Sequence, residues 1–360
     1  MRQYLHYPDD TIYIAGPACF YYGGYALWHA LRGKAEFLGF KVTMPTTNAL
    51  NLTHEDLRLN AHEIFNNCAR AMNDATAVIA DLESFRGHEP DGGSLFELGM
   101  GYARGLRLYG YTRDRRPLIH KLPVAALVND RVVDDRGDDL PYCELPFCPS
   151  LMASTKIFEG DFENALQMLQ IDIDMSKKAV AWPTAQPAQE EIASVPGSVY
   201  LFSAKVFSKD KESYFARAKE AYAAAGINLV TPLDAFPGEP VCDSADPLVK
   251  AHFLFERWQR QVRACETFVV DLNDFNGMEP SGDASILAGM AWQLGKKCIG
   301  YMDDTRRMRD RIPHYGPERD NKDQFGNDVE NFNYPINLMF SAAMPIVEGD
   351  FTAALGELTK

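Results

Sequence analysis

The chain has 360 residues, of which 46% are hydrophobic and 24% are charged, and its formal net charge is −14. This length accommodates two domains, each large enough for a hydrophobic core, and the composition is that of a globular protein. The acidic balance argues against nucleic acid or an anionic membrane as the main partner, because such surfaces are bound by basic patches, and it disfavours a highly phosphorylated substrate.

The N-terminal residues 1–8 lack the apolar segment of a signal peptide. No apolar run along the chain approaches the roughly 18 residues that cross a bilayer. The seven cysteines are scattered without the paired spacing of a zinc site, and we expect them to be reduced thiols. These observations predict a cytoplasmic protein without a metal site.

The first predicted elements are a strand, a turn and a helix. The β-prone run Tyr13–Ala15 ends at Gly16 and Pro17, where a helix cannot continue and a turn is favoured. Apolar residues at helical spacing follow from Leu27 to Leu38.

Strands and helices continue to alternate after this point. The apolar run Ala77–Ala80 is typical of a parallel strand covered on both faces, and a helix over Phe96–Leu106 and a strand over Leu108–Tyr111 follow. This order predicts an open parallel sheet with helices on both faces. Ligands of such sheets bind beyond the carboxyl ends of the strands, so loops 13–20 and 81–91 should converge there.

The second half of the chain repeats the first. The matched segments keep their order, and they are 11–20 with 198–207, 78–87 with 268–277, 110–116 with 300–306 and 159–162 with 348–351. Such an internal repeat decides the architecture before any local pattern does. We therefore predict an α/β protein made of two flavodoxin-like, doubly wound parallel-sheet repeats that form an intrachain pseudo-dimer.

The segment between the repeats is rich in Pro, Ala and Gln, which is typical of a linker without a core of its own. The predicted organisation is a catalytic domain over residues 1–171, a linker over 172–197 and a degenerate copy of the domain over 198–360.

The two halves differ in a pair of acidic residues. Asp91 lies in a glycine-rich loop and Glu97 follows six residues later at the start of the predicted helix, whereas the second half has Ser281 and Leu287 at these positions. Two carboxylates about 5 Å apart are what a retaining glycosyl transfer requires. Gly93 in the loop would let the backbone approach a ligand closely.

A simpler interpretation of this spacing stays open. Asp91 also suits a helix cap, and Glu97 also suits a solvated helical position. The neighbours of Glu97 are apolar, however, and an unpaired carboxylate is costly in such a setting. The helix N-terminus is expected to favour an ionised Glu97 at neutral pH.

Three segments, 12–17, 80–82 and 86–99, resemble the nucleoside 2-deoxyribosyltransferase family. The resemblance covers nearly all of the first half and extends more weakly over the second. It implies that Glu97 is the nucleophile, and that Asp91 contacts the sugar and assists proton transfer to the base.

The resemblance also implies further site residues. Tyr13 would hydrogen-bond and orient the nucleophile, although a strand tyrosine of the core is the alternative. Gly16 and Pro17 form the turn whose backbone would line the pocket, and Asp81 ends the neighbouring strand. Phe20 is a candidate either for packing on the nucleobase or for the core.

One family element falls in the second half. Family members carry a Pro-x-Asn-Leu-Met segment whose Asn reaches the sugar site of a neighbouring subunit, and here the segment contains Asn337. The first half has Ser150 in the matching place. The resemblance therefore implies one working site in each chain, completed by Asn337, although a plain turn residue is the alternative.

The resulting prediction is a pentosyltransferase that exchanges the nucleobase of a 2'-deoxynucleoside through a covalent deoxyribosyl-Glu97 intermediate, with retention at C1'. Its partners would be a deoxynucleoside and a free base, without a cofactor, a metal, nucleic acid or a membrane, and further homo-oligomers stay open. Two alternatives remain. One is a hydrolase of 2'-deoxynucleosides or their 5'-monophosphates, and the other is a non-catalytic nucleoside-binding protein.

Overall fold

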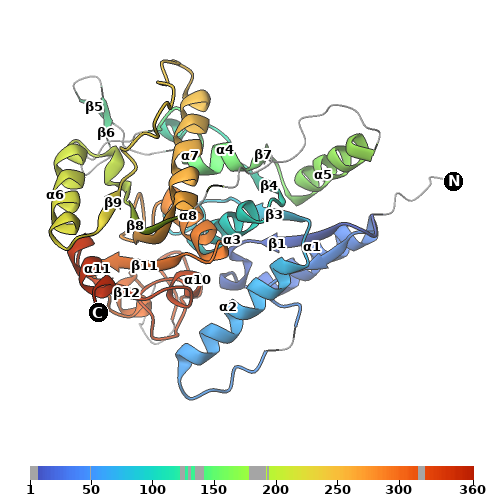
Figure 1. Cartoon of the computed structure of the whole chain (residues 1–360). Coiled ribbons are helices and arrows are strands. Elements are labelled where there is room, and N and C mark those ends of the chain that lie inside the picture. The colour runs from blue at the N-terminus through green and yellow to red at the C-terminus, as the bar shows by residue number, and fades with distance from the viewer. Residues whose placement is uncertain are drawn as a thin grey trace.

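The computed structural model describes residues 7–48, 50–121, 126–128, 131–133, 142–177, 192, 194–314 and 321–360. Within these residues each half of the chain forms a five-stranded parallel sheet, and a short antiparallel pair, β5 (Ala126–Val128) and β6 (Arg131–Val133), lies outside both sheets (Figure 1). No helix in the described part is long and apolar enough to cross a membrane.

The sheet of the first half has the strand order β2-β1-β3-β4-β7. Its strands are β1 (Thr11–Ala15), β2 (Lys41–Thr43), β3 (Ala77–Asp81), β4 (Arg107–Thr112) and β7 (Lys156–Glu159). The helices of this half are α1 (Gly24–Phe37), α2 (Leu57–Asn73), α3 (Gly92–Ala103), α4 (Pro149–Ser154) and α5 (Phe162–Lys177), with short 3-10 turns at η1 (Pro17–Phe20) and η2 (Leu118–His120).

The sheet of the second half has the equivalent order, β9-β8-β10-β11-β12. Its strands are β8 (Val195–Phe202), β9 (Asn228–Val230), β10 (Cys265–Asp271), β11 (Lys297–Met302) and β12 (Ile346–Glu348). The helices are α6 (Lys211–Ala224), α7 (Pro247–Ala264), α8 (Gly282–Gln293), α9 (Met308–Arg311), α10 (Leu338–Ser341) and α11 (Phe351–Leu358), with η3 (Ala204–Phe207) after β8.

This shared strand order confirms the predicted pair of flavodoxin-like repeats. In such a sheet the chain reverses its direction of winding between the first and third strands of the repeat, and ligands bind at that switch point. The switch points here lie between β1 and β3 in the first half and between β8 and β10 in the second.

Alternating residues of the strands face two separate cores. In β1, Tyr13 and Ala15 belong to one buried cluster, whereas Ile12 and Ile14 belong to another. The second cluster is closed by α1 and α5 and stays within the first half. The first cluster continues through α2 and α3 into residues of the second half, so the two halves share one hydrophobic core.

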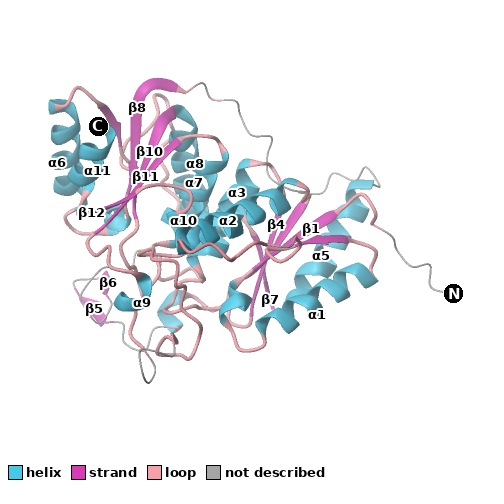
Figure 2. Cartoon of the chain, turned by 90° about the horizontal axis from the view of Figure 1, so that it is seen from below, coloured by secondary structure: helices cyan, strands magenta, loops and turns pink. Residues whose placement is uncertain are grey.

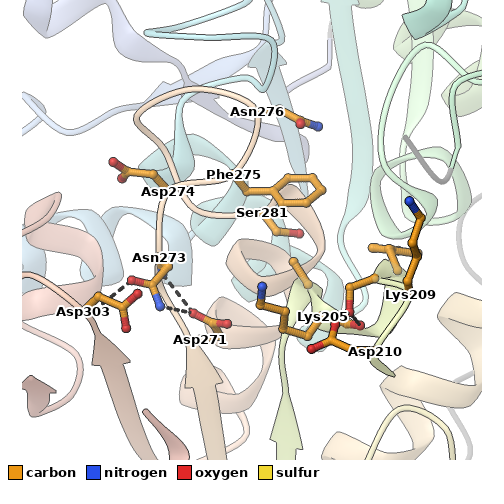
Figure 3. Close-up of a pocket in the computed structure, with 13 residues that line it drawn as sticks. Lys205, Lys209, Asp210, Asp271, Asn273, Asp274, Phe275, Asn276, Ser281 and Asp303 are labelled. Atoms are coloured by element: carbon orange, nitrogen blue, oxygen red, sulfur yellow. Dashed lines mark hydrogen bonds between the residues drawn. The ribbon is translucent and has the colours of Figure 1, made fainter. Parts of the chain in front are cut away.

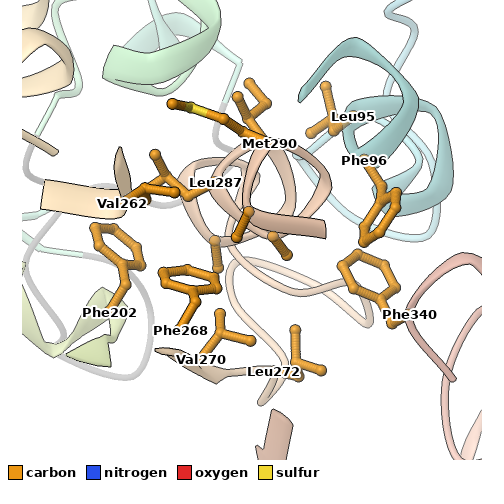
Figure 4. Packing of buried hydrophobic residues seen from close by; sticks show 14 of the residues in the cluster. Leu95, Phe96, Phe202, Val262, Phe268, Val270, Leu272, Leu287, Met290 and Phe340 are labelled. Atoms are coloured by element: carbon orange, nitrogen blue, oxygen red, sulfur yellow. The ribbon is translucent and has the colours of Figure 1, made fainter. Parts of the chain in front are cut away.

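The shared core lies between the two sheets. Helices α2, α3, α7, α8 and α10 fill the space between the sheets, while α1 and α5 cover the outer face of one sheet and α6 and α11 that of the other (Figure 2). Phe96 of α3 meets Phe340 of α10 edge to face at 5.3 Å within this layer (Figure 4).

Two glycines allow α3 and α8 to cross closely. A Cβ atom on Gly99 would lie 2.0 Å from the carbonyl oxygen of Ile286, and one on Gly289 would lie 1.9 Å from that of Phe96. Neither distance is possible for a real Cβ atom, so only glycine fits at either position. Gly99 and Gly289, which occupy equivalent positions in the two repeats, therefore allow the two halves to pack closely against each other.

Some boundaries differ from the sequence-based prediction. Helix α3 begins at Gly92 rather than Phe96, because the side chain of Asp91 accepts a hydrogen bond from the backbone of its first turn. The predicted linker over 172–197 has ordered ends, since α5 continues to Lys177 and β8 begins at Val195. Residues 178–191 and 193 of that segment lie outside the described residues.

Candidate active site

A cavity of about 350 Å³ opens at the switch point of the first sheet. The first half contributes residues from the loops after β1 and β2, from α1 and α2 and from the start of α3, and the second half contributes Asn321 and residues 328–332 and 337–339. Of the sequence-predicted residues, Gly16, Phe20, Asp91, Gly93, Glu97 and Asn337 line this cavity.

Glu97 lies in the wall of the cavity with only 5% of its surface exposed, so it is not a solvated helical residue. Its Oε1 atom accepts a hydrogen bond from the hydroxyl of Tyr13, which is fully buried in the middle of β1. This bond gives the buried tyrosine a polar partner and fixes the orientation of the carboxyl group.

Burial raises the pKa of Glu97 to about 8, the hydrogen bond from Tyr13 opposes this rise, and the charge of Asp91 adds to it. The expectation that the helix N-terminus keeps Glu97 ionised at neutral pH is therefore wrong. Glu97 is the sixth residue of α3, beyond the first turn where the helix dipole acts strongly, and desolvation outweighs it.

Asp91 is the N-terminal cap of α3. Its Oδ2 atom accepts hydrogen bonds from the backbone N–H of Ser94 at 2.8 Å and from the Ser94 hydroxyl at 2.6 Å. Burial raises the pKa of Asp91, and the two bonds from Ser94 lower it. The interpretation of Asp91 as a helix cap is thus confirmed, and the same side chain also lines the cavity.

Asn337 comes from the second half and lies against Asp91. Its Nδ2 atom donates to Oδ1 of Asp91 at 3.4 Å, and its own Oδ1 atom accepts the N–H of Met339 at 2.9 Å, which caps α10. A Cβ atom on Gly93 would lie 2.7 Å from that Nδ2 atom. Gly93 therefore makes room for the amide of Asn337.

Arg86 ties the second half to this wall of the cavity. Its buried guanidinium donates to Asp323 at 2.9 Å, to the carbonyl oxygen of Asp328 at 2.7 Å and to Glu279 at 3.4 Å. The same group lies 4.4 Å from the centre of the Phe85 ring. These contacts hold the segment that precedes residues 328–332 in place.

The remaining predicted residues lie around the cavity. Gly16 has φ +153°, and a Cβ atom there would lie 2.9 Å from that of Asp81, so glycine is required. Phe20 stacks on Phe85 at 5.3 Å and is 7% exposed, so it is both a core residue and part of the lining. Pro17 begins η1 and Asp81 ends β3, and neither is among the residues that line the cavity.

The sequence did not single out several residues of the cavity. Glu330 accepts the N–H of Leu338 at 2.7 Å, and burial raises its pKa to about 8. Cys68 of α2 also lines the cavity, and a hydrogen bond from its thiol lowers the pKa of Glu97. A signal for this wall is the largely polar segment Asn327–Asn331, which lies shortly before the Pro-x-Asn-Leu-Met segment.

The cavity is acidic and otherwise largely apolar. Its ionisable lining residues include four carboxylates, from Asp91, Glu97, Asp328 and Glu330. Among the described residues that line it there is no lysine, arginine or histidine. Trp28 is one of the apolar side chains that close the remaining walls. Nothing in this lining offers a positive charge to a phosphate group.

The second half has lost the corresponding polar groups. Leu287, at the position of Glu97, is fully buried and points toward Phe202 and Val262 in the core (Figure 4). Tyr200, at the position of Tyr13, keeps its hydroxyl, but this buried group has no hydrogen-bond partner among the described residues. The second half therefore keeps the tyrosine but has no carboxylate at the position where Glu97 accepts its hydrogen bond in the first half.

The fold and the site together define a two-repeat α/β protein with a buried pair of carboxylates at the switch point of one sheet. The chain belongs to the nucleoside 2-deoxyribosyltransferase family, whose model matches residues 12–143 and 199–339. This match covers more than half of the chain and includes both repeats, which confirms the resemblance of the sequence motifs.

Similar chains occur among solved structures. The 2-desoxiribosyltransferase from Leishmania mexicana is 30% identical over 44% of this chain and 96% of that chain, with a TM-score of 0.34. The glycosyltransferase SnogD from Streptomyces nogalater is 10% identical over 97% of this chain and 98% of that chain, with a TM-score of 0.21. Both TM-scores are low, so neither superposition supports a conclusion about this chain. No curated protein sequence matches it.

Proposed function

We propose that this protein is a nucleoside 2-deoxyribosyltransferase, which exchanges the nucleobase of a 2'-deoxynucleoside with retention at C1'. The observation that carries the proposal is the buried Glu97. Its carboxyl group accepts a hydrogen bond from Tyr13, and it lines one cavity together with Asp91 and Asn337. A nucleophile, a group that orients it and a second acid are the components that such a transfer needs.

In the proposed first step, a carboxylate oxygen of Glu97 attacks C1' while the C1'–N bond breaks. The electron pair of that bond leaves with the base, which takes up a proton with the assistance of Asp91. Burial raises the pKa of Asp91 and so favours the form that can give a proton. In the second step another base gives up a proton, attacks C1' and releases Glu97.

The proposed site is shared between the halves. Asn337 holds Oδ1 of Asp91, and Arg86 fixes the wall that the second half contributes. We therefore infer that residues 1–171 and 198–360 form two domains of an intrachain pseudo-dimer with one active site per chain.

The lack of basic side chains in the described lining favours a nucleoside over a nucleoside monophosphate. Four carboxylates line the cavity, and none of its described lining residues is basic. A 5'-phosphate would lose its hydration there without gaining a cation, since no basic side chain is among the described lining residues. The hydrolase of 5'-monophosphates is therefore the weaker alternative.

An exchange assay tests the proposal. The full-length protein is incubated with thymidine and free adenine, and the products are separated by chromatography. Formation of deoxyadenosine supports the transferase, whereas free deoxyribose alone would identify a hydrolase. If neither deoxyadenosine nor free deoxyribose forms, the protein binds nucleosides without catalysis.

Two variants assign the chemistry to the first half. Glu97→Ala is expected to reduce exchange by at least about 10⁴-fold, because the covalent route is lost. Leu287→Ala is the matched control, since it alters the equivalent helix of the second half and should leave exchange by the folded protein unchanged. Unaltered base release in Glu97→Ala would overturn the mechanism.

A further inference from the structure

One carboxyl group of the first cavity has no part in the proposed exchange. Glu330 lines this cavity and belongs to the second half of the chain. Its Oε2 atom accepts the N–H of Leu338 at 2.7 Å, and its Oε1 atom forms no hydrogen bond or ion pair with a residue that the structure describes. That second oxygen is therefore available to a ligand in the cavity.

Contacts of the second half fix Glu330 relative to the rest of the site. Leu338 directly follows Asn337, and the amide of Asn337 donates to Asp91 at 3.4 Å. The charges of Arg86 and Asp91 both act on the pKa of Glu330, which burial raises to about 8. At neutral pH its carboxyl group therefore retains a proton, so it can both accept and donate a hydrogen bond.

The cavity of the second half shows that a wall from the other half is not a general feature of this fold. That cavity has a volume of about 410 Å³ and follows β8, β10 and β11 (Figure 3). All of its described lining residues come from the second half itself, between Ala204 and Asp303. The first cavity, in contrast, is closed by residues 328–332 of the other half. A carboxyl group on a wall that belongs to the proposed active site alone is suited to substrate recognition.

The stereochemistry of the proposed reaction decides which group of the substrate meets this wall. In a β-2'-deoxynucleoside the base and the 5'-hydroxymethyl group project from one face of the sugar ring, and the 3'-hydroxyl projects from the other. A nucleophile that displaces the base approaches C1' from the face opposite the base. The 3'-hydroxyl therefore lies on the side of Glu97, and the 5'-hydroxyl lies on the far side of the ring.

We propose that Glu330 is a specificity-determining residue that binds the 5'-hydroxyl of the deoxynucleoside. The inference rests on the proposed transferase, because the attack by Glu97 sets the orientation of the sugar. Glu97 lies in the wall of the first half and Glu330 in the wall of the second, so a sugar whose C1' meets Glu97 directs its 5'-hydroxyl toward Glu330. A 5'-phosphate would meet a carboxyl group at this place, without a basic residue among the described lining. The second half thus takes part in the choice of substrate.

Selectivity for the 5'-hydroxyl tests this inference. The full-length protein exchanges the base of thymidine or of 5'-deoxythymidine with free adenine, and the ratio of the two kcat/KM values measures the selectivity. Wild type should prefer thymidine by about tenfold, which corresponds to one hydrogen bond. Glu330→Ala should reduce this ratio to about one, because the partner of the hydroxyl is lost. A purely structural role would lower both kcat/KM values together, so an unchanged ratio would overturn the inference.

Two further variants support the comparison. Glu330→Gln keeps the size of the side chain and an oxygen acceptor for the N–H of Leu338, so it tests the inference even where Glu330→Ala does not fold. Its amide group can donate to the 5'-oxygen but cannot accept the hydroxyl proton as well, so its selectivity should fall between those of wild type and Glu330→Ala. Selectivity equal to that of wild type would contradict the inference. Glu212→Ala removes an exposed glutamate at the start of α6, outside the cavity, and should leave both kcat/KM values unchanged.

Two further substrates identify the group that Glu330 binds. The selectivity of thymidine over 3'-deoxythymidine should be the same in wild type and in Glu330→Ala. A change in this ratio alone would assign Glu330 to the 3'-hydroxyl and overturn the inference. Thymidine 5'-monophosphate should have a kcat/KM at least about tenfold below that of thymidine, because its phosphate would lose hydration without gaining a cation. An equal kcat/KM for the two substrates would also overturn the inference.

Binding distinguishes a failure of this inference from a failure of the proposed function. In the Glu97→Ala background no transfer occurs, and isothermal titration gives the same selectivity as a ratio of two Kd values. Wild type that exchanges no bases would overturn the transferase, but a ratio of Kd values that Glu330→Ala reduces in this background would still support the contact with the 5'-hydroxyl. Conversely, exchange by wild type with both ratios unaffected by Glu330→Ala would overturn the contact and leave the transferase standing.

Discussion

A cavity follows β1 and β3 in the first half and another follows β8 and β10 in the second, so two copies of one fold each have a cavity at the same place, yet their linings differ. Four carboxylates line each of them, but the carboxylates stand at different positions, and the second cavity also has Lys205 and Lys209 in its lining. The strands and helices around them follow the same order. The two cavities therefore differ through the side chains at each switch point, because the fold itself is common to both halves.

The differences between the halves are paired across their interface. In the first site Gly93 leaves space that the amide of Asn337 fills. At the equivalent place in the second half, Asp283 stands for the glycine and Ser150 for the asparagine, and the N–H of Ser150 donates to Asp283 at 2.8 Å. Each substitution is thus matched by one in the facing half, which keeps the interface packed on both sides.

The largest expected effect concerns the arginine that joins the halves. Arg86→Ala should lower the free energy of unfolding by about 3–5 kcal/mol, because it leaves two buried carboxylates, Glu279 and Asp323, without their cation. Its counterpart Asn276 has an amide nitrogen without a described partner, so Asn276→Ala should change the stability by less than about 1 kcal/mol. Chemical denaturation measures both. An equal loss of stability in the two variants would contradict the conclusion that Arg86, and not Asn276, joins the halves through buried contacts.

The next effect tests whether the site is shared. Asn337→Ala should reduce kcat/KM for base exchange by about 100-fold, because Asp91 loses its hydrogen bond from the second half. Ser150→Ala is the matched control in the first half and should leave kcat/KM unchanged. Steady-state kinetics at a fixed pH make the comparison. An unaffected Asn337→Ala variant would show that Asn337 serves only to cap α10.

The pH dependence tests the setting of the nucleophile. Burial raises the pKa of Glu97 to about 8, and only the ionised carboxylate attacks C1'. Below that pKa the ionised fraction rises with pH, so kcat/KM should increase by about 50-fold between pH 6 and pH 8 and then level off. The pH profile of kcat/KM reports the pKa of Glu97 in the free enzyme. A kcat/KM that stays constant over this range would contradict a raised pKa.

Much of the architecture follows from local patterns in the sequence. The apolar strands β1 and β3 and the repeated motifs are local features, and each was found at the expected place. Asp91, Glu97 and Asn337 were singled out from motifs, and they line one cavity. Their spacing carries this information because it fixes where each residue lies relative to a strand end or a helix start.

Other properties of the site depend on contacts between distant segments. Burial raises the pKa of Glu97, and the spacing of residues along the chain does not show that burial. The wall at Glu330 has no counterpart in the repeat alignment, so the alignment could not place it. The role of Gly99 in the crossing of α3 and α8 likewise depends on a carbonyl group of Ile286 in the other half.

The smallest effect compares the two equivalent tyrosines. Tyr200→Phe should raise the free energy of unfolding by about 1 kcal/mol, because it removes a buried hydroxyl that lacks a partner and leaves the ring in place. Tyr13→Phe should instead lower kcat/KM, because Glu97 loses the hydrogen bond that favours its ionised form. Thermal unfolding and exchange kinetics on both variants complete the comparison. If Tyr200→Phe proved destabilising, the hydroxyl of Tyr200 would have a hydrogen-bond partner in place of Glu97. That result would contradict the conclusion that the second half has lost the polar groups of the site.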